Sequence, residues 1–172
     1  MDTPAETLTD GVAELRRWRA EHREELTATV MASLDHLRAF LIWASPDYTA
    51  DEFLADTAKR WENGEAFEYG VFADGSLAGG IGLMSRPGGI EIGYWLALEH
   101  TGRGLMTRAV ILGVAEAFRC GAGYIEIKHD ELNVRSAAVP ARLGFTQVRE
   151  ETAELPLAPA CGGRNIVWRR ER

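Results

Sequence analysis

The sequence has few cysteines, no long apolar run and no excess of positive charge. Its two cysteines, Cys120 and Cys161, provide neither a disulfide framework nor the spacing of a metal site, which favours a reducing compartment. No run approaches the roughly 20 apolar residues that a membrane helix needs, and the N-terminus does not resemble a signal peptide. The net charge of -7 disfavours DNA or RNA as a main partner, because phosphate binding requires a basic surface. We therefore expect a cytoplasmic protein that binds neither membrane, nucleic acid nor metal.

The 172 residues are enough for one domain (1–172) with a sizeable core, preceded by a loose leader at 1–10. Hydrophobic periodicity and turn signals predict the following elements. In chain order they are a strand at 12–18, helices at 19–32, 34–42 and 51–62, strands at 67–71, 77–84 and 90–98, a helix at 102–119, a strand at 124–127, a helix at 133–143, and strands at 145–151 and 164–169. This order indicates an α+β (α/β) fold whose mixed sheet carries helices on both faces.

Two of these elements carry local signals. Gly79, Gly80 and Gly82 weaken the interior of strand 77–84, which indicates that backbone or a ligand approaches the strand closely. In helix 102–119 the polar residues fall within one stripe, which we expect to be exposed while the remaining faces are buried. The residues of that stripe are Arg108, Glu116 and Arg119.

The most informative segment is the turn Gly102-Arg103-Gly104, which joins strand 90–98 to helix 102–119. Such a turn directs several backbone N–H groups and the positive end of the helix dipole at one point, which suits a phosphate or pyrophosphate. Arg103 adds positive charge, and Thr107 is a polar residue on an otherwise buried side. The missing Lys-Ser/Thr pair excludes a nucleotide-hydrolysing P-loop, and the antiparallel strands before the turn disfavour a dinucleotide-binding fold. The alternative is a plain helix-start turn.

A second informative segment is the helix that begins near Asn133 and contains Ser136 and Pro140. Asn133 can cap this helix, and Ser136 can be an ordinary solvated serine. Pro140 is more telling, because its ring removes the hydrogen bond to the Ser136 carbonyl and bends the helix. A bend next to Ser136 indicates that a ligand or a second strand end lies there.

Together these segments resemble the GNAT superfamily of acetyl-CoA-dependent N-acetyltransferases, and in particular the branch that acetylates the N-termini of ribosomal proteins. The resemblance is carried by Gly93-Tyr94-Trp95-Leu96, Gly102-Arg103-Gly104-Leu105-Met106-Thr107, Asn133 with Ser136, and Leu143-Gly144-Phe145. One departure is Glu99, which stands where the superfamily pattern has Gln or Arg. The resemblance implies a mostly antiparallel sheet that splays at its central strand.

The resemblance also implies how acetyl-CoA binds. The end of strand 90–98 would bond the pantetheine arm, the backbone near Trp95 and Leu96 would polarise the acetyl carbonyl, and the N–H groups of 102–107 would hold the pyrophosphate. Ser136 would protonate the departing thiolate. The expected cofactor-binding residues are Trp95, Leu96, Leu98, Gly102, Arg103, Gly104, Leu105, Met106, Thr107, Asn133 and Ser136.

Acetyl transfer to an amine also needs a base or a water chain that takes the amine proton. Glu91 is our candidate, because it shares a face of its strand with Trp95; an exposed carboxylate is the alternative interpretation. His129, at the end of the strand that precedes the Asn133 helix, competes with Glu91 for this role. Water remains a third option. Because neither cysteine is placed as a nucleophile, the sequence favours direct attack within a ternary complex.

The acceptor is less defined by the sequence. Residues 19–62 and the loop 155–164 should line the acceptor site. Acidic and aromatic side chains there could attract an amine. These candidates are Asp35, His36, Trp43, Asp47 and Asp51. A protein N-terminus, an antibiotic, a polyamine or another small amine all fit, and a homodimer is left open. The rival hypothesis is a non-catalytic acyl-CoA-binding sensor or regulatory module.

Overall fold

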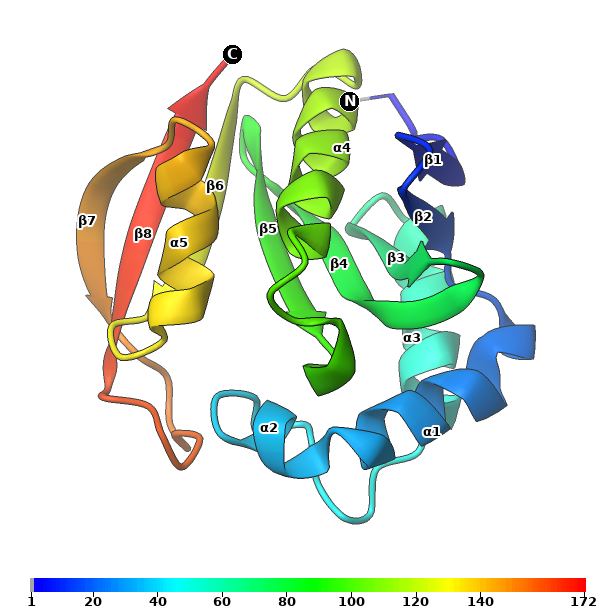
Figure 1. Ribbon diagram of the computed structural model, residues 1–172. Helices are drawn as coiled ribbons and strands as arrows, with labels where there is room; N and C mark the ends of the chain where they lie inside the picture. Colours follow the sequence, from blue (N-terminus) through cyan, green and yellow to red (C-terminus); the bar gives the residue numbers. More distant parts are fainter. Residues whose placement is uncertain (1) are drawn as a thin grey trace.

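Eight strands form one sheet in the order β1-β2-β3-β4-β5-β6-β8-β7 in the computed structural model, which describes residues 2–172 (Figure 1). The strands are β1 (Thr7–Thr9), β2 (Ala13–Arg17), β3 (Ala66–Ala73), β4 (Ser76–Arg86), β5 (Gly89–Leu96), β6 (Tyr124–Asp130), β7 (Thr146–Thr152) and β8 (Arg164–Glu171). Neighbouring strands are antiparallel except β5 and β6, which are parallel. The predicted mixed, mostly antiparallel sheet is therefore confirmed.

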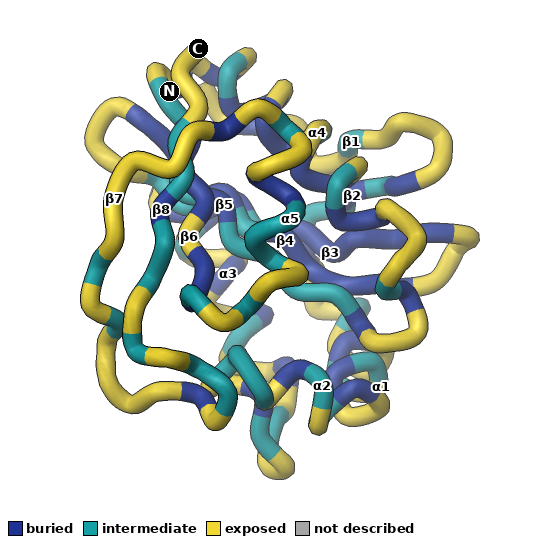
Figure 2. The backbone as a smooth tube through the Cα atoms, turned by 60° about the vertical axis from the view of Figure 1, so that its left-hand side comes forward, coloured by how far each residue is buried: buried dark blue, intermediate teal, exposed yellow. Residues whose placement is uncertain are grey.

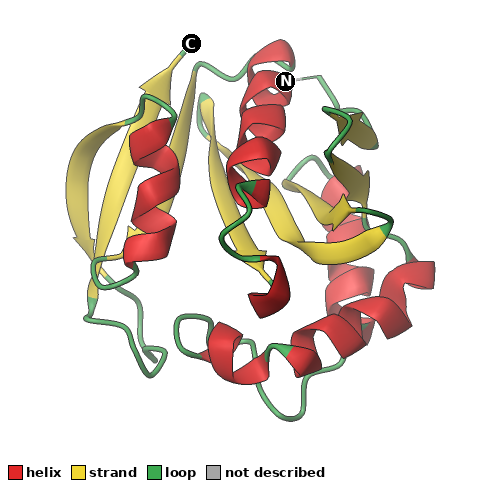
Figure 3. Ribbon diagram, in the orientation of Figure 1, coloured by secondary structure: helices red, strands yellow, loops and turns green. Residues whose placement is uncertain are grey.

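Helices cover both faces of this sheet, as predicted (Figure 3). They are α1 (Arg23–Ala32), α2 (Leu34–Arg38), α3 (Asp51–Glu62), α4 (Leu105–Arg119) and α5 (Val134–Arg142), with short 3-10 turns at Ala20–His22 and Leu98–His100. The helix expected at 34–42 ends at Arg38, and the chain continues in turns closed by bonds to the Leu37 carbonyl. Helices α4 and α5 lie on one face, whereas α1 and α3 pack against the other (Figure 1).

Successive side chains of the central strands point to opposite faces of the sheet, so the same strands contribute to the hydrophobic core on each face. On β5, Ile92 packs with the α4 residues Met106 and Val110, whereas Trp95 packs with Leu26 and Leu54 on the opposite face. The strands β3 and β4 are thus buried on both sides, while β7 at the sheet edge is exposed along nearly its whole length (Figure 2). The larger of the two cores lies under α4.

The parallel pair β5–β6 separates along its length. Their pairing runs only from Gly89 with Tyr124 to Ile92 with Ile127, after which both strands continue apart (Figure 1). The gap widens toward α2. The splay that the family resemblance implied is present, and it leaves one side of the last residues of β5 without a strand partner.

The glycines of β4 allow β5 to approach closely, as predicted. A Cβ atom on Gly79 would lie 2.2 Å from the Trp95 carbonyl oxygen, and one on Gly80 would lie 2.5 Å from the Trp95 indole nitrogen. No side chain larger than hydrogen fits at either position. These glycines therefore fix Trp95 against β4.

The N-terminal segment differs from the expected loose leader. Thr7–Thr9 forms the edge strand β1, and the N–H of Ala5 donates to Glu116 Oε1 at 2.6 Å. The Tyr69 hydroxyl donates to the Ala5 carbonyl at 2.8 Å. Glu116 is consequently buried, so the expectation of an exposed Arg108–Glu116–Arg119 stripe is wrong at its central residue. The polar segment was mistaken for a leader because its partners are distant in sequence.

Within residues 2–172, no helix combines the length and the apolar character required to cross a membrane.

Candidate active site

A cavity of about 870 Å³ lies where β5 and β6 separate. Its walls come from α2 and the turns after it, from the end of β5 through the first turn of α4, and from the start of α5. The lining residues are His36, Leu37, Ala39, Phe40, Leu41, Tyr94, Trp95, Leu96, Leu98, Thr101, Gly102, Gly104, Leu105, Met106, Thr107, Leu132, Asn133, Val134, Arg135, Ser136, Ala138, Val139 and Arg142.

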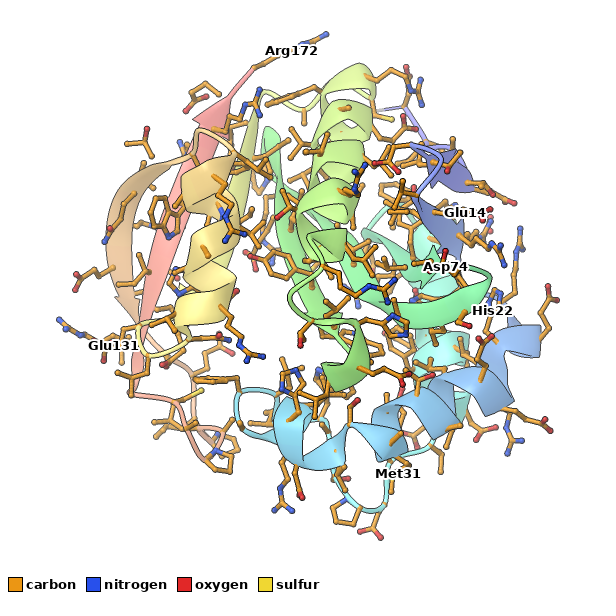
Figure 4. All side chains as sticks on the ribbon, in the orientation of Figure 1. Glu14, His22, Met31, Asp74, Glu131 and Arg172 are labelled. Carbon is orange, nitrogen blue, oxygen red and sulfur yellow. The ribbon has the colours of Figure 1, made fainter. Side chains whose placement is uncertain are left out.

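The fold thus brings the glycine turn and the Asn-Ser helix to one cavity. Ten of the expected cofactor-binding residues are in its wall, namely Trp95, Leu96, Leu98, Gly102, Gly104, Leu105, Met106, Thr107, Asn133 and Ser136. The exception is Arg103. Its guanidinium lies 3.2 Å from Asp74 Oδ2 and 3.4 Å from His100 Nδ1. Asp74 is at the tip of the β3–β4 hairpin (Figure 4), so Arg103 is held away from the cavity.

The start of α4 is an open set of hydrogen-bond donors. Gly104 precedes the helix with a φ of 73°, and within residues 2–172 no side chain caps it. The first bond along the helix runs from the Arg108 N–H to the Gly104 carbonyl at 3.2 Å, so the N–H groups before Arg108 remain available. A Cβ atom on Gly102 or Gly104 would meet nothing within 4 Å. Backbone donors facing open space at a helix N-terminus fit a phosphate group.

Positive charge reaches the cavity from α5 rather than from the turn. Arg135 and Arg142 both line it, and their spacing of seven residues places them on one face of the helix. Sequence reasoning missed this pair, although the spacing itself was a usable signal. The two guanidiniums border the same cavity as the open N-terminus of α4, which increases the attraction for an anionic ligand.

The end of β5 also offers free backbone groups. Ala97 donates its N–H to the Ala78 carbonyl at 2.8 Å, so its backbone faces β4. Because successive residues in a strand direct their backbone groups to opposite sides, the N–H and C=O groups of Leu96 and Tyr94 face the gap. These groups are unpaired by β6, which has already diverged. They can bond an extended ligand or stabilise negative charge on a carbonyl oxygen.

Ser136 lies opposite this strand end and contacts it through Tyr94. The Tyr94 hydroxyl donates to the Ser136 carbonyl at 2.9 Å, and Ser136 Oγ donates to the Tyr94 hydroxyl oxygen at 3.3 Å. Burial raises the pKa of Tyr94 to about 12, so its phenol is neutral at physiological pH. Asn133 caps α5, because its Oδ1 accepts the N–H of Ser136 at 3.3 Å. The cap engages only the carbonyl end of the Asn133 amide.

The structure does not bring either base candidate into the cavity wall. Glu91 lies 3.1 Å from a guanidinium nitrogen of Arg86 and 3.8 Å from Lys128 Nζ, and it is not a lining residue. His129 is buried, and its Nε2 accepts from Trp168 Nε1 at 2.9 Å. Because indole N–H is only a donor, His129 Nδ1 carries the proton that binds the Asp130 carbonyl at 2.7 Å. Both nitrogens of His129 are therefore engaged.

On the expected acceptor side, an aromatic floor formed by Trp43 and Trp95 borders the cavity, with Trp95 in the lining and Trp43 outside it. Trp43 contacts Trp95 and Tyr48, with ring centroids 5.8 Å and 5.5 Å apart. The loop 155–164 is joined to α2 through the Ala160 N–H, which donates to the Ala39 carbonyl at 2.8 Å. Of the polar candidates, His36 lines the cavity, whereas Asp51 forms a surface ion pair with Arg23 at 2.6 Å. Asp35 and Asp47 are outside the lining.

A sheet that splays beside an uncapped helix N-terminus defines a protein that holds a phosphate-bearing ligand across a strand end. The family model for the acetyltransferase (GNAT) domain matches residues 13–146, and the chain belongs to this family. It is an N-acetyltransferase that uses acetyl-CoA, as the sequence predicted.

Named relatives agree with this assignment. YdaF of Bacillus subtilis (strain 168), which bears the provisional name ribosomal N-acetyltransferase, is 29% identical over 143 residues, covering 77% of each chain. RimL, a ribosomal L7/L12 alpha-N-protein acetyltransferase solved with coenzyme A, has a TM-score of 0.85 at 22% identity, covering 96% of this chain and 98% of RimL. RimJ of Mycobacterium smegmatis, solved with a CoA-disulfide, has a TM-score of 0.83 at 20% identity, covering 99% of this chain and 87% of RimJ. The two solved structures show that the fold is shared.

Proposed function

We propose that this acetyltransferase modifies the N-terminal amine of a protein, as the name of RimL describes for that protein. The observation that carries the proposal is the cavity itself, because one wall presents open amides for a phosphate and the opposite wall is formed by α2. An acceptor chain entering along α2 would reach the free end of β5. The aromatic floor at Trp43 and Trp95 would contact the first residues of such a chain.

The residues present fit acetyl-CoA. The N–H groups of Gly104 to Thr107 would hold its diphosphate, Arg135 and Arg142 would face its phosphates, and the free backbone of Tyr94 and Leu96 would bond the pantetheine arm. Bound acetyl-CoA supplies the acetyl group and a thiolate leaving group. The Leu96 N–H would be the donor placed to stabilise negative charge on the acetyl carbonyl oxygen.

Ser136 is the proposed acid. Its Oγ–H lies at the end of β5 and can rotate from the Tyr94 hydroxyl toward the departing sulfur. A proton delivered at that atom converts the departing thiolate into free thiol, and Ser136 regains its proton from water in the cavity. Neither Cys120 nor Cys161 lines the cavity, so direct attack by the amine within a ternary complex accounts for the transfer without an acetyl-enzyme.

For the base, we propose water in the cavity in place of Glu91 or His129. An α-amine has an ordinary pKa of about 7.7–8.0, so an appreciable fraction is neutral near pH 8 without a strong base. Glu91 is held by Arg86 and Lys128, and both nitrogens of His129 are engaged within the protein. The amine proton therefore leaves through solvent on the α2 side.

The test is release of free thiol from acetyl-CoA across a panel of acceptors. Peptides with free N-termini should support turnover, whereas the same peptides with blocked N-termini, aminoglycosides and polyamines should not. Turnover on a small amine alone would replace the proposed acceptor, and CoA binding without thiol release on any acceptor would favour the rival sensor module. The Ser136→Ala variant should retain affinity for CoA while its kcat falls about 100-fold.

The same assay examines the base. Glu91→Gln should change kcat by less than about threefold, because Glu91 is outside the cavity wall. A large loss with a displaced pH profile would return the role to Glu91. In parallel, His36→Gln removes the one imidazole in the cavity wall. If the acidic limb of the kcat–pH profile disappeared in that variant, the base that takes the amine proton would be His36 instead of water.

A further inference from the structure

Pro140 leaves a gap in the hydrogen bonding of α5. It lies inside the helix, and without an N–H it cannot donate to the carbonyl four residues earlier, which belongs to Ser136. Pro140 is fully buried, and the Ser136 carbonyl lies in a partly buried place at the edge of the cavity. A carbonyl left without a donor in such a place is costly, and native structures almost always supply a partner.

The partner comes from another element of the fold. Tyr94, on β5 and 42 residues away in sequence, donates its hydroxyl to the Ser136 carbonyl at 2.9 Å. Tyr94 lies beyond Ile92, the last residue of β5 that pairs with β6. Its side chain therefore links β5 to α5, the helix that follows β6, across the cavity where β5 and β6 diverge. One hydrogen bond completes the helix and tethers it to the strand.

We infer that Tyr94 is a positioning residue for the reaction: its hydroxyl replaces the N–H that Pro140 lacks and thereby fixes Ser136 against the free amides at the end of β5. This inference rests on the proposed role of Ser136 as the acid. The Leu96 amide and the Ser136 hydroxyl must act on two atoms of the same thioester, so their separation has to be constant. α5 also packs on the core through Val139 and the buried Pro140, so the bond from Tyr94 sets the position of Ser136 within a helix that is already docked.

Tyr94 itself does not donate a proton in the reaction. Its single proton is directed at the Ser136 carbonyl, and burial raises the pKa of its phenol to about 12. The oxygen of the same hydroxyl accepts from Ser136 Oγ at 3.3 Å. Tyr94 thus contacts both the carbonyl and the hydroxyl of Ser136. The hydroxyl contact is long, so the Ser136 O–H can still rotate toward the sulfur.

A double-mutant cycle between Tyr94 and Pro140 tests this inference. Tyr94→Phe removes the tether, and we expect kcat to fall at least about tenfold while the KM for acetyl-CoA changes little. Pro140→Ala restores a backbone N–H for the Ser136 carbonyl. The double variant Tyr94→Phe/Pro140→Ala should therefore recover most of the lost kcat, measured against Pro140→Ala alone.

Tyr69→Phe is the matched control. Tyr69 is also buried and also donates to a backbone carbonyl, that of Ala5 at 2.8 Å, but it does not line the cavity. We expect Tyr69→Phe and Tyr94→Phe each to lower the melting temperature by about 3–8 °C. Only Tyr94→Phe should lower kcat, which separates positioning from general stability.

Each outcome decides the matter. Wild-type kcat in Tyr94→Phe would overturn the inference, and so would a double variant as slow as Tyr94→Phe, because the hydroxyl would then act on the reaction itself. If Ser136→Ala keeps wild-type turnover, the proposed acid falls and the inference falls with it. If Ser136→Ala is slow and the rescue fails, the inference alone is overturned.

Discussion

The two helices that border the cavity begin in opposite ways. α4 follows a left-handed glycine, and within residues 2–172 no side chain caps its first N–H groups. α5 follows Asn133, whose side-chain oxygen accepts the N–H of Ser136. Both N-termini carry the same partial positive charge, but only that of α4 is left open for a ligand. A helix N-terminus thus becomes a binding site only where the protein does not satisfy it.

The largest effect is expected when the open N-terminus of α4 is closed. Gly104→Val adds a side chain at a φ of 73°, in space that nothing in the protein fills. Loss of two hydrogen bonds to a charged phosphate, at about 1.5–3 kcal/mol each, should weaken CoA binding about 100-fold or more. Isothermal titration calorimetry with CoA measures this.

The control for that variant is Gly64→Val. Gly64 has a φ of 71° and equally open surroundings, but it lies at the end of α3 and outside the cavity. Both variants should lose about 1–3 kcal/mol of stability from backbone strain. Equal CoA affinity in the two variants would show that the α4 N-terminus is not the phosphate site.

Because the N-terminus of α5 is capped by Asn133, α5 must contribute to CoA binding in another way. We expect its charges to act instead, so Arg135→Gln combined with Arg142→Gln should weaken CoA binding about tenfold, with a smaller salt dependence. Arg103→Gln is the matched control, because Arg103 contacts Asp74 outside the cavity. A larger loss in Arg103→Gln than in the α5 variant would return the role to the glycine turn.

The smallest expected effect concerns the cap itself. Asn133→Ala removes the acceptor for the Ser136 N–H and should lower the free energy of unfolding by about 1 kcal/mol, measured by urea denaturation. CoA affinity should fall much less than in Gly104→Val. A loss of affinity comparable to that of Gly104→Val would identify Asn133 chiefly as a cofactor ligand.

Local signals in the sequence were reliable where the physics is local. Periodicity identified the helices and all strands but β1, and the glycines of β4 correctly indicated a close approach by β5. The Gly102–Gly104 turn identified a helix start with open amides. Pro140 indicated that a ligand or a second strand end lies next to Ser136, and the side chain of Tyr94 from β5 is bonded there, although nothing in the sequence identified Tyr94 as that residue.

Side-chain alternation and backbone geometry within a few residues were enough to predict every α-helix and strand except β1, together with their order. The family was predicted from the resemblance of the glycine turn and the Asn133 helix to known motifs, and the family model confirms it. The tertiary structure alone decided which charged and polar groups face the cavity. It paired Arg103 with Asp74, enclosed His129 with Trp168, and placed Arg135 and Arg142 in the wall. Such pairings join residues far apart in the chain, and their geometry exists only after the sheet has folded and its two central strands have separated.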